Sequence, residues 1–296
     1  MKYYRFEDAC GRSWLAVELE SGKLLDLTSA WDTARDFEDL LNAARMLRRT
    51  PDEAVQALLR EESTAPCTFA ELEEKGLHLA RPLIPKEVWA AGVTYRISRE
   101  ERQKESALPE PYARVYQAER PELFFKATAQ RCVGPFEAIG IRGDSTWDVP
   151  EPELALVLYR GKIVGYTVGN DVSSRSIEGE NPLYLPQAKI YDRCCAIGPC
   201  ITTPAEIADP QKLEVRCEIV RDGNTIFEGE ASTSEMVRSC EELAQFLMGH
   251  NRVPDCTVLL TGTGIVPAEE ITLLGGDIVR ITIEGIGTLE NPVVQV

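Results

Sequence analysis

The chain has 296 residues, 48 of them acidic and 32 basic, which gives a formal net charge of −16 and leaves only two histidines. Phosphate backbones and anionic lipids repel such a charge, so we expect no nucleic acid and no membrane surface as a partner. Two histidines are too few for a histidine-rich metal cage. Carboxylates, lysine or a hard metal ion are therefore the expected basis of any catalysis.

The sequence also indicates where the protein is expected to act. No apolar run approaches the roughly 18 residues that span a bilayer, and the opening MKYYRFEDAC lacks the pattern of a secretory signal. The nine cysteines include no C-x-x-C pair, which favours free thiols in a reducing compartment. We therefore expect a soluble, cytoplasmic protein.

The first third of the chain differs in pattern from the rest. Residues 1–29 alternate apolar and polar side chains around Ser21-Gly22, which predicts a β-hairpin. Helical periodicity follows over residues 30–49 and 51–62, where Pro51 suits a helix start. Two prolines within residues 81–85 then suggest a boundary. The predicted domains are a small α/β domain at 1–81 and a larger one at 82–296.

Strand patterns dominate the larger domain. Residues 213–229 read as two strands joined by a turn at Asp222-Gly223, and a capping box of Ser239 and Glu242 predicts a helix over 239–250. Helices are too few for alternating βαβ units. Motifs for dinucleotides, nucleoside triphosphates, zinc proteases and serine hydrolases are absent from the sequence. The pattern indicates an α+β fold rich in strands.

One predicted hairpin gathers carboxylates. Residues 153–159 and 162–170 are apolar on both faces, as central strands are, and Glu151 and Glu153 share a face because they are two residues apart. If residues 160–162 form a three-residue loop, opposite residue numbers sum to 322. Asp171 then lies across from Glu151 on the same face. A two-residue loop would place Asp171 on the opposite face.

Three carboxylates among apolar strands would repel one another unless a cation lay between them. A hard divalent cation is the economical solution, and Mg²⁺ fits best because three protein ligands leave positions for water and substrate. Mn²⁺ and Ca²⁺ are the expected substitutes. The alternative is a set of three solvated carboxylates at the end of a strand.

At these residues the chain resembles the fumarylacetoacetate hydrolase superfamily over most of residues 82–296. The matching segments occur in the order that the family shows: AGVTYR, ELFFK, EPELA, GYTVGNDVSSR, AKIYD with IGP, TSEM, LLTGTG and GDIVRITIEGIGTLENPV. The resemblance implies a mixed, β-rich roll and a divalent metal held by Glu151, Glu153 and Asp171. Relatives in this superfamily commonly form dimers or tetramers, so a homo-oligomer is expected.

The resemblance also implies roles for residues outside the hairpin. Lys189 matches the family's site lysine, and a desolvated lysine beside a metal can serve as acid or base and contact substrate. Thr263, between two glycines, matches the threonine that holds the substrate carboxylate. Glu122 is a second acid/base candidate because it shares a strand face with Lys126. A surface lysine, an ordinary turn and a strand-start carboxylate are the respective alternatives.

Ser98 separates the branches of the family. The carbon–carbon hydrolases place a histidine three residues after the tyrosine of a G-x-N-Y-like motif, whereas here Tyr95 is followed by Arg-Ile-Ser. Residues 144–199 look most like the 2-keto-3-deoxy-arabinonate dehydratases. In that chemistry a 2-oxo acid chelates Mg²⁺, a proton leaves the carbon beside the keto group, and the β-hydroxyl leaves as water. Tautomerisation then gives the 2,5-dioxo acid.

The expected function is thus a Mg²⁺-dependent hydro-lyase acting on a small 2-keto-3-deoxy sugar acid. Two alternatives stay open on sequence alone. One is a C–C hydrolase or decarboxylase of an acylpyruvate or other 2-oxo acid, which would need a base to activate water. The other is a protein that binds metal and a 2-oxo acid without catalysis.

Overall fold

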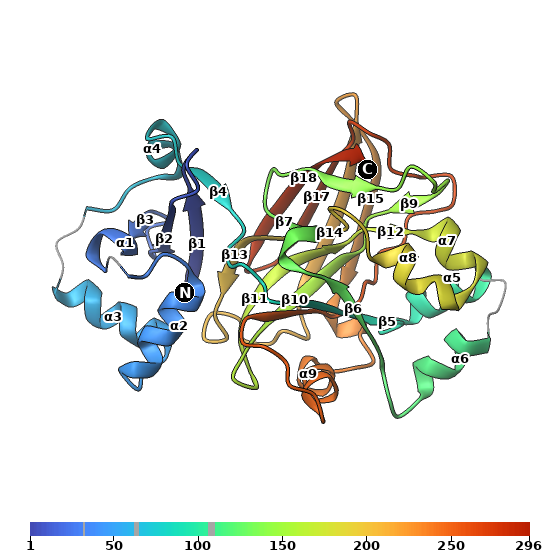
Figure 1. Cartoon of the computed structure of the whole chain (residues 1–296), viewed down its shortest axis with the longest axis horizontal. Helices are drawn as coiled ribbons and strands as arrows, with labels where there is room; N and C mark the ends of the chain where they lie inside the picture. Colours follow the sequence, from blue (N-terminus) through green and yellow to red (C-terminus); the bar gives the residue numbers. More distant parts are fainter. Residues whose placement is uncertain (32, 62–64, 106–109) are drawn as a thin grey trace.

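The computed structural model describes residues 1–31, 33–61, 65–105 and 110–296. Residues 32 and 62, which the predicted helices include, lie outside these ranges. The fold is a strand-rich α+β structure, as predicted, with a smaller group of N-terminal elements beside a larger body (Figure 1). None of the described helices is long and apolar enough to cross a membrane.

The elements follow in chain order. The strands are β1 (Lys2–Glu7), β2 (Ser13–Glu18), β3 (Leu24–Asp26), β4 (His78–Ala80), β5 (Val88–Gly92), β6 (Glu122–Ala127), β7 (Cys132–Val133), β8 (Ile139–Ile141), β9 (Asp148–Val149), β10 (Pro152–Tyr159), β11 (Lys162–Asp171), β12 (Ser173–Ser174), β13 (Cys195–Thr202), β14 (Glu214–Arg221), β15 (Asn224–Ser232), β16 (Thr257–Leu260), β17 (Ile278–Ile283) and β18 (Gly287–Gln295). The α-helices are α1 (Leu27–Ala30), α2 (Phe37–Met46), α3 (Pro51–Glu61), α4 (Phe69–Glu74), α5 (Arg96–Glu105), α6 (Glu110–Gln117), α7 (Arg175–Glu180), α8 (Leu185–Lys189) and α9 (Cys240–Met248). Short 3₁₀ turns occupy Ala129–Arg131, Pro182–Tyr184 and Thr233–Glu235.

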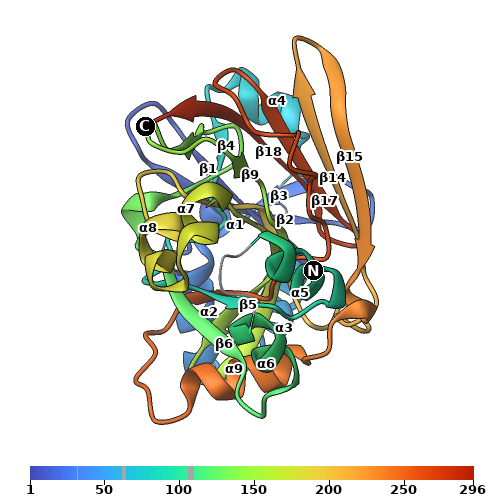
Figure 2. The ribbon, with the colours of Figure 1, turned by 90° about the vertical axis from the view of Figure 1, so that its right-hand side faces the viewer.

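Two large sheets form the body of the molecule. The first runs β3-β2-β1-β13-β11-β10-β16-β5-β6, with β4 beside β1 and β7 beside β13, and the second runs β15-β14-β17-β18-β8. Parallel pairs, such as β16 with β5 and β18 with β8, stand among antiparallel ones, so the sheets are mixed. Helices α5, α7 and α8 gather on the side of the molecule that faces the viewer in Figure 2.

The N-terminal elements join the first sheet rather than forming a separate one. Strand β1 pairs with β13, with Tyr3 opposite Ile201. Side chains of β2 and α2, including Leu15 and Leu40, belong to the same apolar cluster as Val157 of β10. The boundary between domains 1–81 and 82–296 stays a prediction.

Strand β10 is central, as its apolar pattern predicts. All its residues are buried. Leu154 and Leu156 belong to the core that includes the apolar side chains of β14 and β17, whereas Ala155 and Val157 belong to the core shared with α2. The alternation follows from the two-residue period of a strand. It also places Glu153 on the same face as Ala155 and Val157.

The β10–β11 connection corrects one prediction and confirms another. The loop has two residues, not three: Arg160 and Gly161 both have positive φ, and Tyr159 pairs with Lys162. Two successive residues in the left-handed conformation are typical of a two-residue hairpin turn, whose twist matches that of the flanking strands. A bulge then leaves Val164 without a register partner, and beyond it opposite numbers sum to 322, from Val157–Gly165 to Pro152–Asn170. The two-residue turn alone would put Asp171 on the face opposite to Glu151. The extra residue of the bulge returns Asp171 to the face of Glu151.

Other local predictions have mixed outcomes. The turn at Asp222-Gly223 is confirmed. The helix expected over 30–49 begins only at Phe37, because Asp36 caps it by accepting the Asp39 N–H.

Helix α9 is likewise shorter than predicted and ends at Met248. Ser239 accepts the Glu242 N–H at 3.0 Å, but the Glu242 carboxylate pairs with Arg238 at 2.6 Å in place of completing a capping box.

Candidate active site

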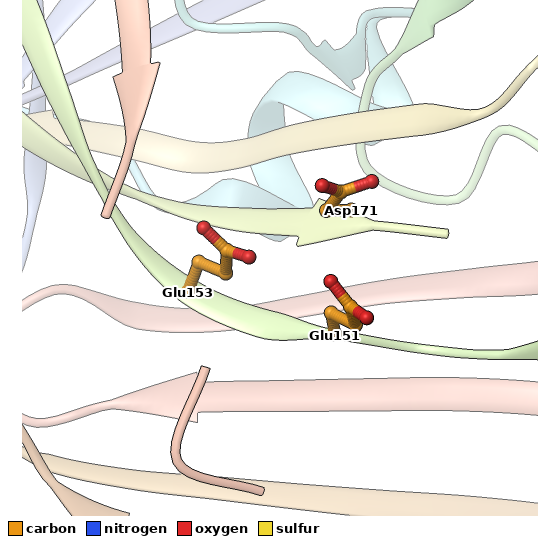
Figure 3. Close-up of side chains that lie close together, drawn as sticks. All are labelled: Glu151, Glu153 and Asp171. Carbon is orange, nitrogen blue, oxygen red and sulfur yellow. The ribbon is translucent and has the colours of Figure 1, made fainter. Parts of the chain in front are cut away.

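Three carboxylates from the β10–β11 hairpin converge in the interior. Glu151, Glu153 and Asp171 each offer an oxygen atom within 4.8 Å of the others, and their side chains lie close together (Figure 3). All three residues are buried, with exposed fractions of 4% or less. The arrangement depends on the register, because the Asp171 N–H donates to the Glu151 carbonyl at 3.0 Å and holds the two residues opposite each other.

Lys189, at the end of α8, reaches into this cluster. Its Nζ donates to Glu151 Oε2 at 2.6 Å and Ser173 Oγ at 2.7 Å, and lies 3.4 Å from Asp171 Oδ2. Only 2% of the residue is exposed. The structure thus places this predicted site lysine against two of the three carboxylates.

Two further cationic side chains contact carboxylates of the cluster. Lys126, at the end of β6, forms an ion pair with Asp171 Oδ1 and donates to the carbonyls of Val172 and Lys189. Arg175, the first residue of α7, lies 3.0 Å from Glu151 Oε1. Three carboxylates therefore have three buried cations around them, which offsets part of the cost of burying each charge.

Among the residues that the structure describes, Glu153 has no such close cation. Burial raises its pKa well above the ordinary value, and the negative charges of Asp171 and Glu151 raise it further. The Gly262 N–H and the charge of Lys189 act in the opposite direction. Ionising Glu153 beside two other carboxylates is therefore costly. A cation bound among the three would lower that cost.

The donor set suits a hard divalent cation. Carboxylate oxygens are the ligands that Mg²⁺ and Ca²⁺ prefer, and Mg²⁺ usually keeps open positions for water or substrate. Soft metals favour sulfur or imidazole instead, and the three clustered side chains provide neither. The three residues therefore fit a magnesium ion by the chemistry of their oxygens and by their spacing.

A small cavity lies beside the cluster and brings the remaining predicted residues together. Its walls include Glu151, Glu153 and Lys189 together with Glu122, Thr263 and Ser98. Glu122 begins β6 opposite Gly92, and a Cβ atom at Gly92 would collide with the Glu122 carboxylate, so the glycine leaves room for it.

Thr263 differs in detail from the prediction. Its hydroxyl exchanges hydrogen bonds with Ile265, donating to the carbonyl and accepting the N–H, both at 3.1 Å. The backbone N–H that points at a carboxylate is that of Gly262, which donates to Glu153 at 2.5 Å. The residue nevertheless lines the cavity and is buried.

Sequence reasoning missed Arg175, Ser173 and Glu178 at this site. All three follow Asp171 closely, and Glu178 also lines the cavity. The sequence does offer one signal, because these residues closely follow the predicted metal ligand Asp171. Ser174, whose hydroxyl caps α7, also marks the start of a helix there. The turn into α7 brings Arg175 back to Glu151, and spacing in the sequence does not reveal that return.

The chain belongs to the fumarylacetoacetate hydrolase family. A family model described as fumarylacetoacetate (FAA) hydrolase C-terminal matches residues 87–294. The strand-rich fold and the hairpin of carboxylates described above lie within that range.

Curated relatives and solved structures narrow the comparison. A probable 2-keto-3-deoxyxylonate dehydratase of Haloferax volcanii is 55% identical over 271 residues, which cover 92% of each chain. A 2-dehydro-3-deoxy-D-arabinonate dehydratase of Saccharolobus solfataricus is 50% identical over 222 residues, 73% of this chain and 74% of the relative. A structure of 2-keto-3-deoxy-D-arabinonate dehydratase with magnesium and 2,5-dioxopentanoate has 38% identity and a TM-score of 0.83, and the match covers 100% of this chain and 99% of the other.

Proposed function

We propose that this protein is a magnesium-dependent hydro-lyase that converts a 2-keto-3-deoxy pentonic acid into 2,5-dioxopentanoate and water. The observation that carries the proposal is the buried group of Glu151, Glu153 and Asp171 with Lys189 against it. The dehydratases of Haloferax and Saccharolobus, at 55% and 50% identity, support the same reaction class. So does the related dehydratase structure with magnesium and 2,5-dioxopentanoate.

The names of the two relatives are chemically compatible. Removal of the hydroxyl at C3 and oxidation at C2 abolish both stereocentres, so an arabinonate and a xylonate that share their C4 configuration give one and the same 2-keto-3-deoxy acid. The names of the two relatives therefore describe the same substrate when the C4 configuration is the same. Panels of substrates should include both enantiomers of this acid, which differ at C4.

Glu151, Glu153 and Asp171 would hold the metal. The metal, when bound, would polarise the 2-oxo acid as a Lewis acid and ease loss of a proton from the carbon beside the keto group. Lys189 Nζ is the group we assign to move that proton, because it lies among the ligands and lines the cavity. Glu122 is the second acid/base candidate. Thr263 would help to hold the substrate carboxylate.

The alternatives require a group to activate water. Ser98 is buried in the wall of the cavity at the position where the C–C hydrolases carry histidine. Both His78 and His250 are exposed and neither lines the cavity. These placements favour elimination over hydrolysis. The relatives described as dehydratases argue against a protein that only binds metal and ligand.

The test is water loss from 2-keto-3-deoxy-arabinonate, followed as formation of 2,5-dioxopentanoate with Mg²⁺, with a chelator, and with Glu151→Gln. We expect activity with Mg²⁺, none with the chelator, and a loss of at least about 100-fold in kcat/KM for the variant. Glu228→Gln is the matched control, because Glu228 is exposed on β15 and does not line the cavity. Full activity without metal, or faster turnover of acylpyruvates or oxaloacetate in the same panel, would refute the proposal.

We further propose that the protein acts in the cytoplasm as a homo-oligomer, a dimer or tetramer, without nucleic-acid or membrane partners. The nine free cysteines suit a reducing compartment, and seven of them are buried. The net charge of −16 supports the absence of anionic partners. Light scattering after size-exclusion chromatography tests the assembly, and a monomer at micromolar concentration would contradict it.

A further inference from the structure

A second cavity lies on the other side of the contact between α5 and α7. Its volume is about 580 Å³, whereas the cavity beside the carboxylates measures about 20 Å³. A single water needs roughly 10–15 Å³ and ligand pockets typically measure about 300–1,000 Å³. In this conformation the metal-side cavity has room for about one water. The neighbouring cavity has room for a small organic acid.

Helices α5 and α7 contribute to the walls of both cavities, and none of the described residues lines both. Helix α5 contributes Ser98 to the metal side and Glu101 to the larger cavity, and α7 contributes Glu178 to one and Ser176 to the other. Arg175 lines the larger cavity while its Nη2 lies 3.0 Å from Glu151. One side chain therefore connects the larger cavity to a candidate metal ligand.

Hydrogen bonds hold the Ser176 hydroxyl in place on the wall of the larger cavity. Ser176 Oγ lies 3.0 Å from Ser145 Oγ, which in turn lies 2.8 Å from Ser174 Oγ. The Thr146 N–H donates to Ser176 Oγ at 3.2 Å. Trp147 also lines the cavity, and its indole N–H donates to the Ile271 carbonyl at 3.3 Å, which fixes the ring.

These side chains suit a hydroxylated carbon chain with one carboxylate. Hydroxyls of Thr146 and Ser176 and the carboxylate of Glu269 can hydrogen-bond to the hydroxyls of a sugar, and an indole ring packs against its C–H groups. The guanidinium of Arg175 provides the donors that a carboxylate prefers.

We propose that the cavity bounded by α5, α7 and residues 266–269 is a second binding site for a sugar acid, from which the substrate passes to the carboxylate cluster. The identity of the ligand rests on the proposed function, since sugar acids are its substrate class. Arg175 is the positioning residue between the two sites. The substrate carboxylate leaves the larger cavity toward Arg175 and the candidate metal ligands.

The binding test uses D-arabinonate, which lacks the keto group and the 3-deoxy carbon of the substrate, in the presence of EDTA. Titration calorimetry should detect binding to the wild-type chain without metal. Ala268→Trp should weaken it at least tenfold, because Ala268 is exposed at the cavity wall and an indole would occupy the space. Ala205→Trp is the matched control: Ala205 is exposed and lines neither cavity, so this variant should bind as the wild type does.

Thr146→Val provides a variant with little effect on folding, because Thr146 joins the hydroxyl cluster through its backbone N–H. We expect roughly a threefold to tenfold loss of arabinonate affinity, the effect of one hydrogen bond. In turnover with Mg²⁺, each cavity variant should raise KM by about the same factor by which it weakens arabinonate binding. The kcat of both should stay within about twofold of the wild type, because the carboxylate cluster is intact.

Three results would overturn the inference: no arabinonate binding in EDTA, binding unaffected by Ala268→Trp and Thr146→Val, or an unchanged KM in both variants. The proposed function fails separately. If the chain binds arabinonate in this cavity but dehydrates none of the acids, the reaction assignment is wrong and the binding site stands.

Discussion

Replacement of Lys126 by methionine tests the electrostatic account of the site most directly. The Lys126 side chain is fully buried, pairs with Asp171, and donates to the carbonyls of Val172 and Lys189. Burial acts to lower its pKa, but the charge of Asp171 outweighs burial and the pKa lies above its ordinary value. The lysine is therefore charged at neutral pH, and its loss leaves Asp171 without its closest cation.

The expected cost follows from that geometry. Breaking a buried ion pair by removing one partner typically costs about 3–5 kcal/mol, and methionine preserves most of the volume. For a chain of this size the melting temperature of the metal-free protein should fall by roughly 5–15 °C. Lys212→Met is the matched control: Lys212 is 74% exposed in its pair with Asp209, and its loss should cost less than about 1 kcal/mol.

Urea unfolding followed by circular dichroism, in EDTA and in Mg²⁺, measures the effect. The double variant with Asp171→Asn should recover at least about 1 kcal/mol of the loss, since the uncompensated charge is gone. Mg²⁺ should stabilise Lys126→Met more than the wild type, because one cation fewer competes for the carboxylates. A loss under about 1 kcal/mol for Lys126→Met, or no coupling to Asp171, would refute the reasoning.

Three other predictions concern Asp148, Gly262 and Val164. Burial raises the pKa of Asp148 to about 6, so the stability that its neutral form provides is lost as pH rises from about 4 to 6. Asp148→Asn should therefore be more stable than the wild type above pH 6, by at most about 3 kcal/mol, and equal to it near pH 4 in urea unfolding. Gly262→Ala should lower the affinity for Mg²⁺, measured by calorimetry, because the Gly262 N–H donates to Glu153. Gly262 has a φ of +93°, and a Cβ atom there would lie 3.0 Å from the Ala91 carbonyl and collide with Thr94, so the backbone has to shift. Unchanged affinity would contradict this. Deletion of Val164 should leave Mg²⁺ binding intact by calorimetry, because Val164 is the bulge residue and its removal keeps Val157 opposite Gly165 and Asp171 opposite Glu151. Loss of Mg²⁺ binding in a chain that stays folded by circular dichroism would show that the bulge itself is needed.

The sequence predicted the carboxylate cluster because it depends on short-range rules. Alternation along a strand puts Glu151 and Glu153 on one face, and antiparallel pairing sets Asp171 opposite Glu151. The predicted register sum of 322 is correct at the functional end, although the predicted loop length is wrong. A bulge changes the count in mid-strand and has no clear signature in the residues that form it.

Residues that reach the site from other elements were harder to predict. Lys126 comes from β6, which three strands separate from β11 in the sheet order, and Arg175 turns back at the start of α7. Their contacts depend on how strands and helices pack, not on spacing. Lys189 and Thr263 were predicted from the family resemblance alone. Their distance from the hairpin in the sequence does not indicate that they lie close to it in the fold.

The sequence by itself determined the strand-rich α+β class, the hairpin and the three carboxylates, because each rests on periodicity and pairing between neighbouring segments. Only the tertiary structure decided that three buried cations surround those carboxylates, that β1 extends the central sheet through β13, and that a second cavity adjoins the site across α5 and α7. These features join residues tens to hundreds of positions apart. The packing of whole elements fixes such contacts, and no local pattern encodes them.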